Sequence, residues 1–132
     1  MSDLLQAGSR AWEWLGLRLV ETGEGTAVVE MTSTEHMTNH SGFVHGGMIS
    51  TLADSAMGRS VRTLSPAVTR SMSFDLKLNF INAAKIGENL RATAQVIHAG
   101  RRTVVTECRV EGGGARLVAT ASATFAVTRE KE

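Results

Sequence analysis

NHSGFVHGGMISTLADSAMG, residues 39–58, holds the start of the one long helix that the sequence predicts. The helix is expected from about residue 46 to residue 63, because this segment is rich in Ala, Leu and Met and the Ser65-Pro66 pair would end it. The segment is so apolar that most of the helix should be enclosed by other elements. The rest of the chain is therefore expected to form the layer that encloses it.

Strand patterns lie on both sides of this helix. Before it, residues 15–22 and 26–33 flank the tight turn Gly23-Glu24-Gly25, and a short amphipathic helix is expected at residues 3–14. After it, residues 72–80 alternate apolar and polar side chains, as a half-buried strand does. Further strands are expected at residues 88–99, 103–112 and 115–127, and the turns between these four strands, at residues 85–87, 100–102 and 112–114, predict antiparallel hairpins.

This element order predicts an α+β fold, in which a five- or six-stranded antiparallel sheet wraps around one long central helix. The 132 residues fit a single domain, residues 1–132. Lys and Arg number 14 against 13 Asp and Glu, a formal net charge of +1, which argues against a dedicated nucleic-acid binder. No apolar run reaches the roughly 18 residues of a membrane span, and the N-terminus lacks a secretory signal, so a cytoplasmic protein with no membrane partner is expected.

Glycine is abundant, with 13 residues against a single proline. Most glycines fall in the predicted turns, but Gly46 and Gly47 open the long helix. Backbone N–H groups at a helix start have no partner within the helix and carry partial positive charge, which suits a developing oxyanion. A tight entry of the chain into the helix would explain the same pair without any role in chemistry.

Asp54 is an unusual residue for the middle of a helix whose neighbouring positions are small or apolar. It could be an exposed carboxylate on the solvated side of the helix. The same helical stripe, however, carries Gly47, Ser50, Gly58 and Val61, which do not form a charged face. A partly desolvated carboxylate at this position could act as a general base or as a nucleophile.

The spacing between Gly46 and Asp54 has a geometric consequence. Eight residues separate them, which is about 12 Å along a helix axis. A carbonyl under attack must lie within about 3 Å of its oxyanion donors and close to the attacking group, so one chain cannot bring both residues to one carbonyl. If both are catalytic, Gly46 of one chain must face Asp54 of another, as antiparallel helices in a two-fold dimer would allow.

Other reactive side chains carry weaker signals. His36, His40 and His45 have a spacing that could suggest zinc, but they lie in an irregular segment with no Cys and no acid beyond Glu35 at ligand spacing, so no metal is expected. Cys108 lies in a strand pattern and is expected to be a reduced packing residue. The methionines expected to fill gaps in the core are Met31, Met37, Met48, Met57 and Met72.

Residues 39–58, followed by SFDLKLNFINAAKIGE at residues 73–88, resemble the PaaI-like acyl-CoA thioesterases of the hotdog-fold superfamily. The resemblance extends over about residues 15–127 and rests on the HGGxxxxLAD block and the AxxGE turn. It implies a long helix wrapped by an antiparallel sheet, in chains that assemble into dimers or dimers of dimers (homotetramers).

The resemblance also implies roles for particular residues. Asp54 corresponds to the catalytic carboxylate, Gly46 to the helix-start amide that polarises the thioester carbonyl, and Ser73 to a residue that helps to hold the attacking water. Asn39 corresponds to a polar residue near the scissile group, and His45 to a neighbouring histidine with an orienting role. In the family, the carboxylate and the serine come from the subunit opposite the asparagine and the glycine.

Coenzyme A contacts are expected along the strand that begins at Ser73 and near the turn at residues 98–103. Arg101 and Arg102 in this turn suit phosphate groups, although a solvated hairpin tip explains them equally well. The segment TASATFAV, residues 120–127, departs from some members of the family, which carry basic and histidine residues near the ligand there, so the resemblance does not support a contact from this strand. The residues expected to bind substrate or coenzyme A are Gly47, Asp75, Phe80, His98, Gly100, Arg101 and Arg102.

The activity implied is hydrolysis of an aromatic or medium-chain acyl-CoA to free acid and coenzyme A, with no cofactor. One alternative is a hotdog enoyl-thioester hydratase or dehydratase, which would pair a carboxylate with a histidine. His45 precedes Asp54 by nine residues, half a turn out of phase on a helix, and this argues against such a pair within one chain. The other alternative is a protein that binds acyl-CoA without turnover.

Overall fold

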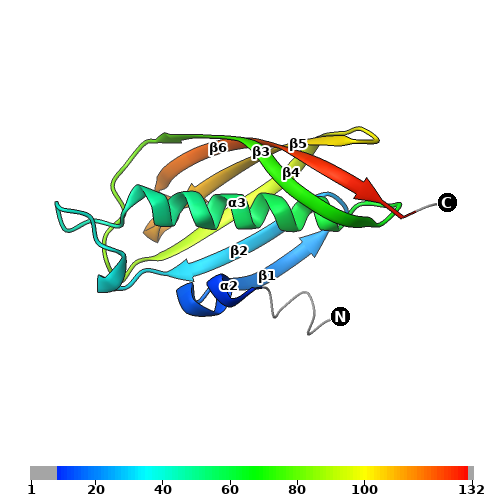
Figure 1. The fold of residues 1–132 in the computed structure, drawn as a ribbon. Coiled ribbons are helices and arrows are strands. Elements are labelled where there is room, and N and C mark those ends of the chain that lie inside the picture. Colours follow the sequence, from blue (N-terminus) through cyan, green and yellow to red (C-terminus); the bar gives the residue numbers. More distant parts are fainter. Residues whose placement is uncertain (1–8, 131–132) are drawn as a thin grey trace.

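The long helix expected near the middle of the chain is also the centre of the fold in a computed structural model, which describes residues 9–130 (Figure 1). This helix, α3 (Gly46–Arg62), has 17 residues. Its buried side includes Leu52, Ala53, Ala56 and Met57. The two alanines are small and fully buried, so the strands can approach the helix closely. The prediction of this helix is confirmed.

Six strands form one antiparallel sheet, which curves around α3 in the order β1-β2-β4-β5-β6-β3 (Figure 1). The strands are β1 (Arg18–Gly23), β2 (Thr26–Thr32), β3 (Val68–Phe80), β4 (Asn89–Ala99), β5 (Thr103–Glu111) and β6 (Leu117–Arg129). Two short 3₁₀ turns complete the described elements, η1 (Glu35–Met37) and η2 (Gly113–Ala115). The α+β hotdog arrangement is confirmed, with six strands.

A short helix, α2 (Arg10–Leu15), precedes the sheet and is fixed at both ends. The Ser9 hydroxyl accepts the Trp12 N–H at 3.3 Å. Gly16 adopts a left-handed φ of 69°, and the next N–H, from Leu17, reaches the Trp12 carbonyl at 2.9 Å. The helix expected at residues 3–14 is thus observed in its second half, and its first part, residues 3–8, lies outside the described residues.

The prediction of a hairpin between β3 and β4 is wrong. The edge of β4 that β3 would need is occupied by β2, which pairs Met31 with Leu90, and β3 instead pairs with β6 at the far side of the sheet. Residues 81–88 are long enough to cross the end of the fold rather than form a turn. Backbone hydrogen bonds hold the crossing, from Ile81 N–H to the Val118 carbonyl at 2.8 Å and from Val44 N–H to the Ala84 carbonyl at 2.9 Å.

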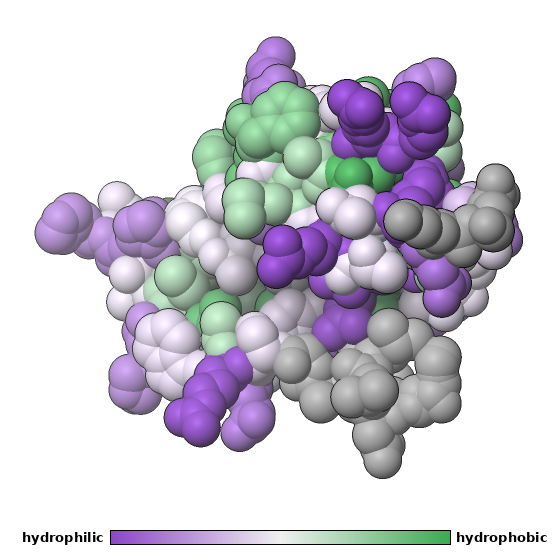
Figure 2. All heavy atoms as spheres, turned by 45° about the vertical axis from the view of Figure 1, so that its right-hand side comes forward, coloured by the Kyte–Doolittle hydropathy of each residue, from purple (hydrophilic) through white to green (hydrophobic). Residues whose placement is uncertain are grey.

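The prediction that β3 is half-buried is also wrong within a single chain. Its apolar positions are among the more exposed of the chain, with Met72 73% exposed, Phe74 63% and Phe80 55%. The cause is topological, because β3 is an edge strand that has a neighbour, β6, on one side only. Met72 therefore does not fill the core, whereas Met31, Met37 and Met57 do. Figure 2 shows hydrophobic side chains gathered on the upper part of one face, beside hydrophilic ones.

Cys108 lies in the core with 3% of its surface exposed. Burial raises the pKa of its thiol to about 12, so the reactive thiolate is scarce at neutral pH. The prediction of a packing role is confirmed. Of the helices formed by residues 9–130, none combines the length and the apolar character needed to cross a bilayer.

Candidate active site

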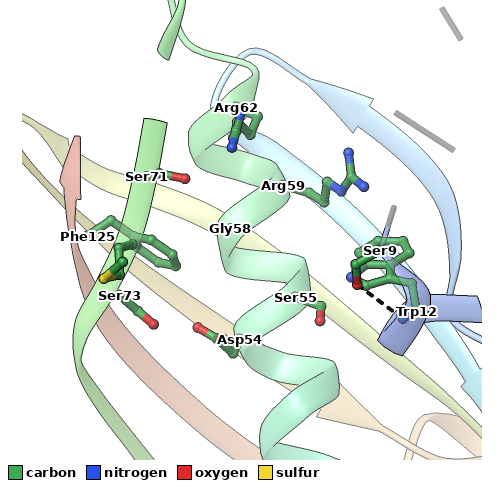
Figure 3. Close-up of a pocket in the computed structure, with 11 residues that line it drawn as sticks. Ser9, Trp12, Asp54, Ser55, Gly58, Arg59, Arg62, Ser71, Ser73 and Phe125 are labelled. Carbon is green, nitrogen blue, oxygen red and sulfur yellow. Dashed lines mark hydrogen bonds between the residues drawn. The ribbon is translucent and has the colours of Figure 1, made fainter. Parts of the chain in front are cut away.

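Asp54 lies at a cavity of about 630 Å³ between α3, β3 and α2. Its Oδ1 atom is buried and has no hydrogen-bond partner within residues 9–130. Figure 3 shows the carboxylate directed from the helix toward Ser73 on β3, which lines the same cavity. Buried polar atoms in proteins are nearly always paired, so an unpaired carboxylate oxygen beside a cavity indicates a position for a water molecule or a ligand.

Helical spacing explains why this cavity opens beside Asp54. Gly58 follows Asp54 by one turn on the same face, and it has no side chain to fill the space. A Cβ atom at Gly58 would lie 3.6 Å from the Phe125 ring, in ordinary contact, so the glycine leaves a gap about one methyl group deep. The Asp54 carboxylate and the gap at Gly58 on α3 thus face Ser73 on β3 across the same cavity.

Gly46 and His45 form the N-terminus of α3. The His45 side chain caps the helix, because its Nδ1 atom accepts the Gly47 N–H at 2.8 Å. The Gly46 N–H, by contrast, has no acceptor in the described part of the chain. The cap therefore uses one helix-start donor and leaves the neighbouring one available to a ligand. The role of His45 that fits this geometry is to orient the helix start.

Replacing the capping histidine should affect stability in a way that depends on the substitute. We expect His45→Ala to lower the free energy of unfolding by about 1 kcal/mol, because the Gly47 N–H loses its acceptor. His45→Asn should retain most of the stability, since asparagine is a strong N-cap residue. Urea unfolding followed by circular dichroism measures both, and equal losses in the two variants would contradict the capping role.

Asn39 organises the loop before α3. Its side-chain oxygen accepts the N–H groups of Ser41 at 2.9 Å and Phe43 at 3.1 Å. Its backbone N–H also donates to the Phe43 carbonyl at 2.8 Å. Because the oxygen is used within the loop, the side-chain NH₂ is the group left to donate to a ligand. Asn39 thus faces any ligand as a hydrogen-bond donor.

Asn39, Gly46 and Phe80 line a second cavity of about 370 Å³. The Phe80 ring covers the helix start so closely that a Cβ atom at Gly46 would lie 3.1 Å from Cζ of the ring. Neither Asp54 nor Ser73 lines this second cavity. The structure therefore places Asp54 and Ser73 at one cavity and Asn39 and Gly46 at another, while His45 caps the helix and lines neither.

An ion pair between Glu88 and Arg116 holds the wall of the second cavity. The Glu88 carboxylate accepts Arg116 Nη1 at 2.7 Å and the N–H groups of Lys85 at 2.8 Å and Gly113 at 2.7 Å. Arg116 Nη2 also donates to the Ala83 carbonyl at 2.7 Å, and Ala83 lines the cavity. The hydrogen bond from Arg116 is the main cause that lowers the pKa of Glu88 to about 2.

This pair should make stability depend on pH. We expect Glu88→Gln to lower the free energy of unfolding by about 2 kcal/mol at neutral pH, because charge-assisted hydrogen bonds are lost. The folded pKa of about 2 lies below the ordinary value of 4.5, so the contribution is complete above pH 4.5 and fades as the pH falls toward 2. Urea unfolding across this range measures the difference, with Glu21→Gln as an exposed control. A difference that stays constant throughout the range would contradict the assignment.

The remaining predicted residues lie elsewhere. His98, Gly100, Arg101 and Arg102 lie at the turn between β4 and β5, at the other end of the molecule from the start of α3 (Figure 1). Arg101 and Arg102 are exposed and line a shallow hollow with the end of β6. Asp75 is exposed on β3 and lines neither the Asp54 cavity nor the Gly46 cavity. In residues 9–130, no three His, Cys, Asp or Glu side chains gather as a metal site would require.

Sequence reasoning missed two arginines of the Asp54 cavity. Arg59 and Arg62 line it from the C-terminal part of α3, and Trp12 lines it from α2 (Figure 3). The spacing of Arg62, two helical turns after Asp54, was a signal that could have indicated a shared face. Trp12 is far away in the sequence, and only the packing of α2 brings it there.

Comparisons with known proteins identify the family of this chain. The family model described as Thioesterase superfamily matches residues 41–119, which include all of α3, the strands β3, β4 and β5 and the start of β6. The acyl-coenzyme A thioesterase PaaI of Escherichia coli strain K12 is 34% identical over 96 residues, which cover 73% of this chain and 66% of that protein. The aligned part thus spans about two thirds of that relative.

Two solved structures show the likeness in three dimensions. The conserved protein PA5202 from Pseudomonas aeruginosa has a TM-score of 0.86 and 35% identity, with 93% of this chain and 97% of that chain covered. A hypothetical thioesterase protein with coenzyme A from Streptococcus pneumoniae has a TM-score of 0.80 and 25% identity, with 88% of each chain covered.

Proposed function

Because this chain belongs to the thioesterase superfamily, as a PaaI-like thioester hydrolase with the hotdog fold, we propose that it hydrolyses an aromatic or medium-chain acyl-CoA with Asp54 as the catalytic carboxylate. The observation that carries the proposal is the buried Oδ1 of Asp54, which lies beside a cavity without a partner in the described chain. A carboxylate in that position is costly to the folded protein unless a ligand or a water molecule uses it.

The reaction adds water across the thioester. As general base, Asp54 takes a proton from water, and the water oxygen attacks the carbonyl carbon. As nucleophile, the Asp54 carboxylate attacks the carbon itself, and water then cleaves the resulting anhydride. In both routes the carbon–sulfur bond breaks, the coenzyme A thiolate leaves and takes up a proton, and the free acid is released. Ser73, on the opposite wall, would hold the attacking water.

The oxyanion donors of the proposed site come from a second chain. Gly46 and Asp54 lie about 12 Å apart along α3 and line different cavities, so one carbonyl cannot contact both in one chain. The Gly46 N–H of a partner would complete the site at Asp54. The Asn39 amide of the same partner would be a second donor, and His45 would be the cap that orients them. A two-fold pair of chains contains two such sites.

The edge strand β3 is the surface proposed for this pairing. Met72, Phe74 and Leu76 are exposed on it, at 73%, 63% and 40%. Long apolar edge strands are normally covered, because their free backbone groups pair readily with other strands. A homo-oligomer, either a dimer or a dimer of dimers, would cover β3 and bring Ser73 close to the partner.

All of the proposed coenzyme A contacts except Phe80, which lines the second cavity, lie outside the two cavities. Arg101 and Arg102 suit the phosphates of the nucleotide, with His98 and Gly100 in the same turn. The pantetheine arm would lie along Asp75 and Phe80 on β3. It would also pass Gly47, which has no side chain to block it. A relative that was solved with coenzyme A supports this class of ligand.

The proposal is tested by measuring thiol release with a disulfide-exchange dye from a panel of aromatic and medium-chain acyl-CoAs. Cys108 is buried, so the native protein should contribute little signal of its own. Steady release with turnover supports the proposal. Hydration of crotonyl-CoA without thiol release would instead identify a hydratase, and tight binding without either reaction would identify a binding protein.

A further inference from the structure

Two arginines that have no carboxylate partner among residues 9–130 border the cavity in which Asp54 lies. Arg59 and Arg62 lie on its wall, together with Ser9 and Ser55 (Figure 3). The same two arginines also line an adjoining hollow of about 270 Å³ next to the β1–β2 turn. Trp12, Met72 and Phe125 also line this cavity, but its wall beyond Asp54 along α3 carries the two guanidinium groups, which do not suit the end of an alkyl chain.

Neither arginine is neutralised by the described part of the chain. The ion pairs within residues 9–130 involve other arginines, and Glu24, which lines the adjoining hollow, forms no ion pair with either one. No hydrogen bond joins the Arg59 or Arg62 guanidinium to a described residue. Cations are favoured in the last turn of a helix, and this explains the presence of two arginines there, but none of the described residues uses their N–H donors.

Arg59 is held in place by an aromatic ring rather than by an acid. Its guanidinium lies 4.5 Å from the centroid of the Trp12 ring, and this contact fixes the side chain at the cavity wall. Burial, and then the nearby Arg62 charge, lower the pKa of Arg59, so the folded chain carries two cations that repel each other. An anion bound between them would relieve this repulsion.

We propose that the acyl group hydrolysed at Asp54 ends in a carboxylate, and that Arg59 and Arg62 bind this end. The inference rests on the proposed function, because it names the substrate class of the same site. Along the axis of α3, Arg59 lies about 7.5 Å and Arg62 about 12 Å beyond Asp54, within reach of the far end of a medium-chain dicarboxylic acid. Bidentate guanidinium–carboxylate pairing would then select half-thioesters of dicarboxylic acids over simple fatty acyl groups.

The anion could also be a phosphate of coenzyme A, and matched substrates distinguish the two sources. The test compares kcat/KM for glutaryl-, adipoyl- and suberyl-CoA with that for valeryl-, hexanoyl- and octanoyl-CoA, which have the same chain lengths without the terminal carboxylate. A parallel set of N-acetylcysteamine thioesters carries the same acyl groups and has no phosphate. The variants are Arg59→Gln, Arg62→Gln and, as a control of equal charge change on β5, Arg109→Gln.

We expect the wild-type protein to prefer a dicarboxylic half-thioester to its matched fatty acyl thioester, with both carriers. Arg62→Gln should lower this preference by about tenfold, and Arg109→Gln should leave it unchanged. The Arg62 side chain is exposed and is not needed for packing, so the variant should fold. Arg59→Gln should act in the same direction, and circular dichroism reports whether it folds.

Three results would overturn the inference. In the first, the wild-type protein hydrolyses the fatty acyl thioesters and shows no preference for the dicarboxylic ones. That result would overturn this inference but would still support the proposed thioesterase function. In another, Arg62→Gln lowers kcat/KM equally for the dicarboxylic and the fatty acyl-CoA substrates and does not change it for the N-acetylcysteamine thioesters. That result would show that the arginines bind a phosphate of coenzyme A. Hydrolysis of none of these thioesters would overturn the proposed function and this inference together.

Discussion

Asp54→Asn should lower kcat for acyl-CoA hydrolysis by at least about 100-fold, because the amide can neither accept a proton from water nor attack a thioester. The fold should survive, since the side chains have nearly the same shape. The free energy of unfolding should be unchanged or higher, because the variant no longer buries a carboxylate oxygen that has no partner among residues 9–130.

The measurement combines thiol release with urea unfolding on the same preparations. Glu21→Gln, which removes an exposed carboxylate from β1, is the control, and it should match the wild-type protein in both assays. A stable Asp54→Asn protein with near-normal turnover would contradict the catalytic assignment. Loss of activity together with loss of stability would indicate a structural carboxylate instead.

The second large effect is the recovery of activity when two inactive variants are mixed. Gly46→Pro should lower kcat by about 100- to 1,000-fold, because it removes the N–H proposed as an oxyanion donor. The backbone tolerates this change, since Gly46 is the first residue of α3 and His45 before it has an extended conformation with φ −62° and ψ 135°. Gly46→Ala, which keeps the N–H and adds a methyl group against Phe80, is the matched control for steric effects.

Chains of Gly46→Pro and Asp54→Asn should restore activity when they are unfolded and refolded together. In a mixed dimer, one site combines both substituted residues and the other combines both intact ones. Random pairing of equal amounts should therefore give about a quarter of the wild-type activity per chain. Mixed oligomers that form, as native mass spectrometry would show, but remain inactive would place both residues in a site within one chain.

The fold could be predicted from the sequence wherever the signal was local. The composition of α3 and the Ser65-Pro66 pair defined the helix, and tight glycine turns defined the hairpins β1–β2, β4–β5 and β5–β6. The pairing of β3 could not be predicted this way. It depends on β2, which is far from β4 in the sequence but pairs with the edge of β4 that β3 would need. The alternation in β3 identified a strand correctly, but its apolar side is not covered within one chain.

Some features of the candidate site could likewise be predicted from local sequence, and others could not. The separation of Gly46 from Asp54 could be calculated from helical geometry alone, and the structure places them in different cavities. The grouping of Asn39 with Phe80 required the crossing segment at residues 81–88, and the grouping of Arg59 with Trp12 required the docking of α2. Such contacts between distant segments carry no periodic signature in the sequence.

The edge strand β3 carries both the surface proposed for pairing and a residue of the proposed active site. Its exposed side offers the apolar surface proposed for pairing, while Ser73 on the same strand faces the Asp54 cavity. If pairing along β3 completes the site, a newly synthesised chain is inert toward cellular thioesters until it meets a second copy. At low expression the total activity would then rise with the square of the chain concentration, so the strength of self-association would itself set the threshold for metabolic flux.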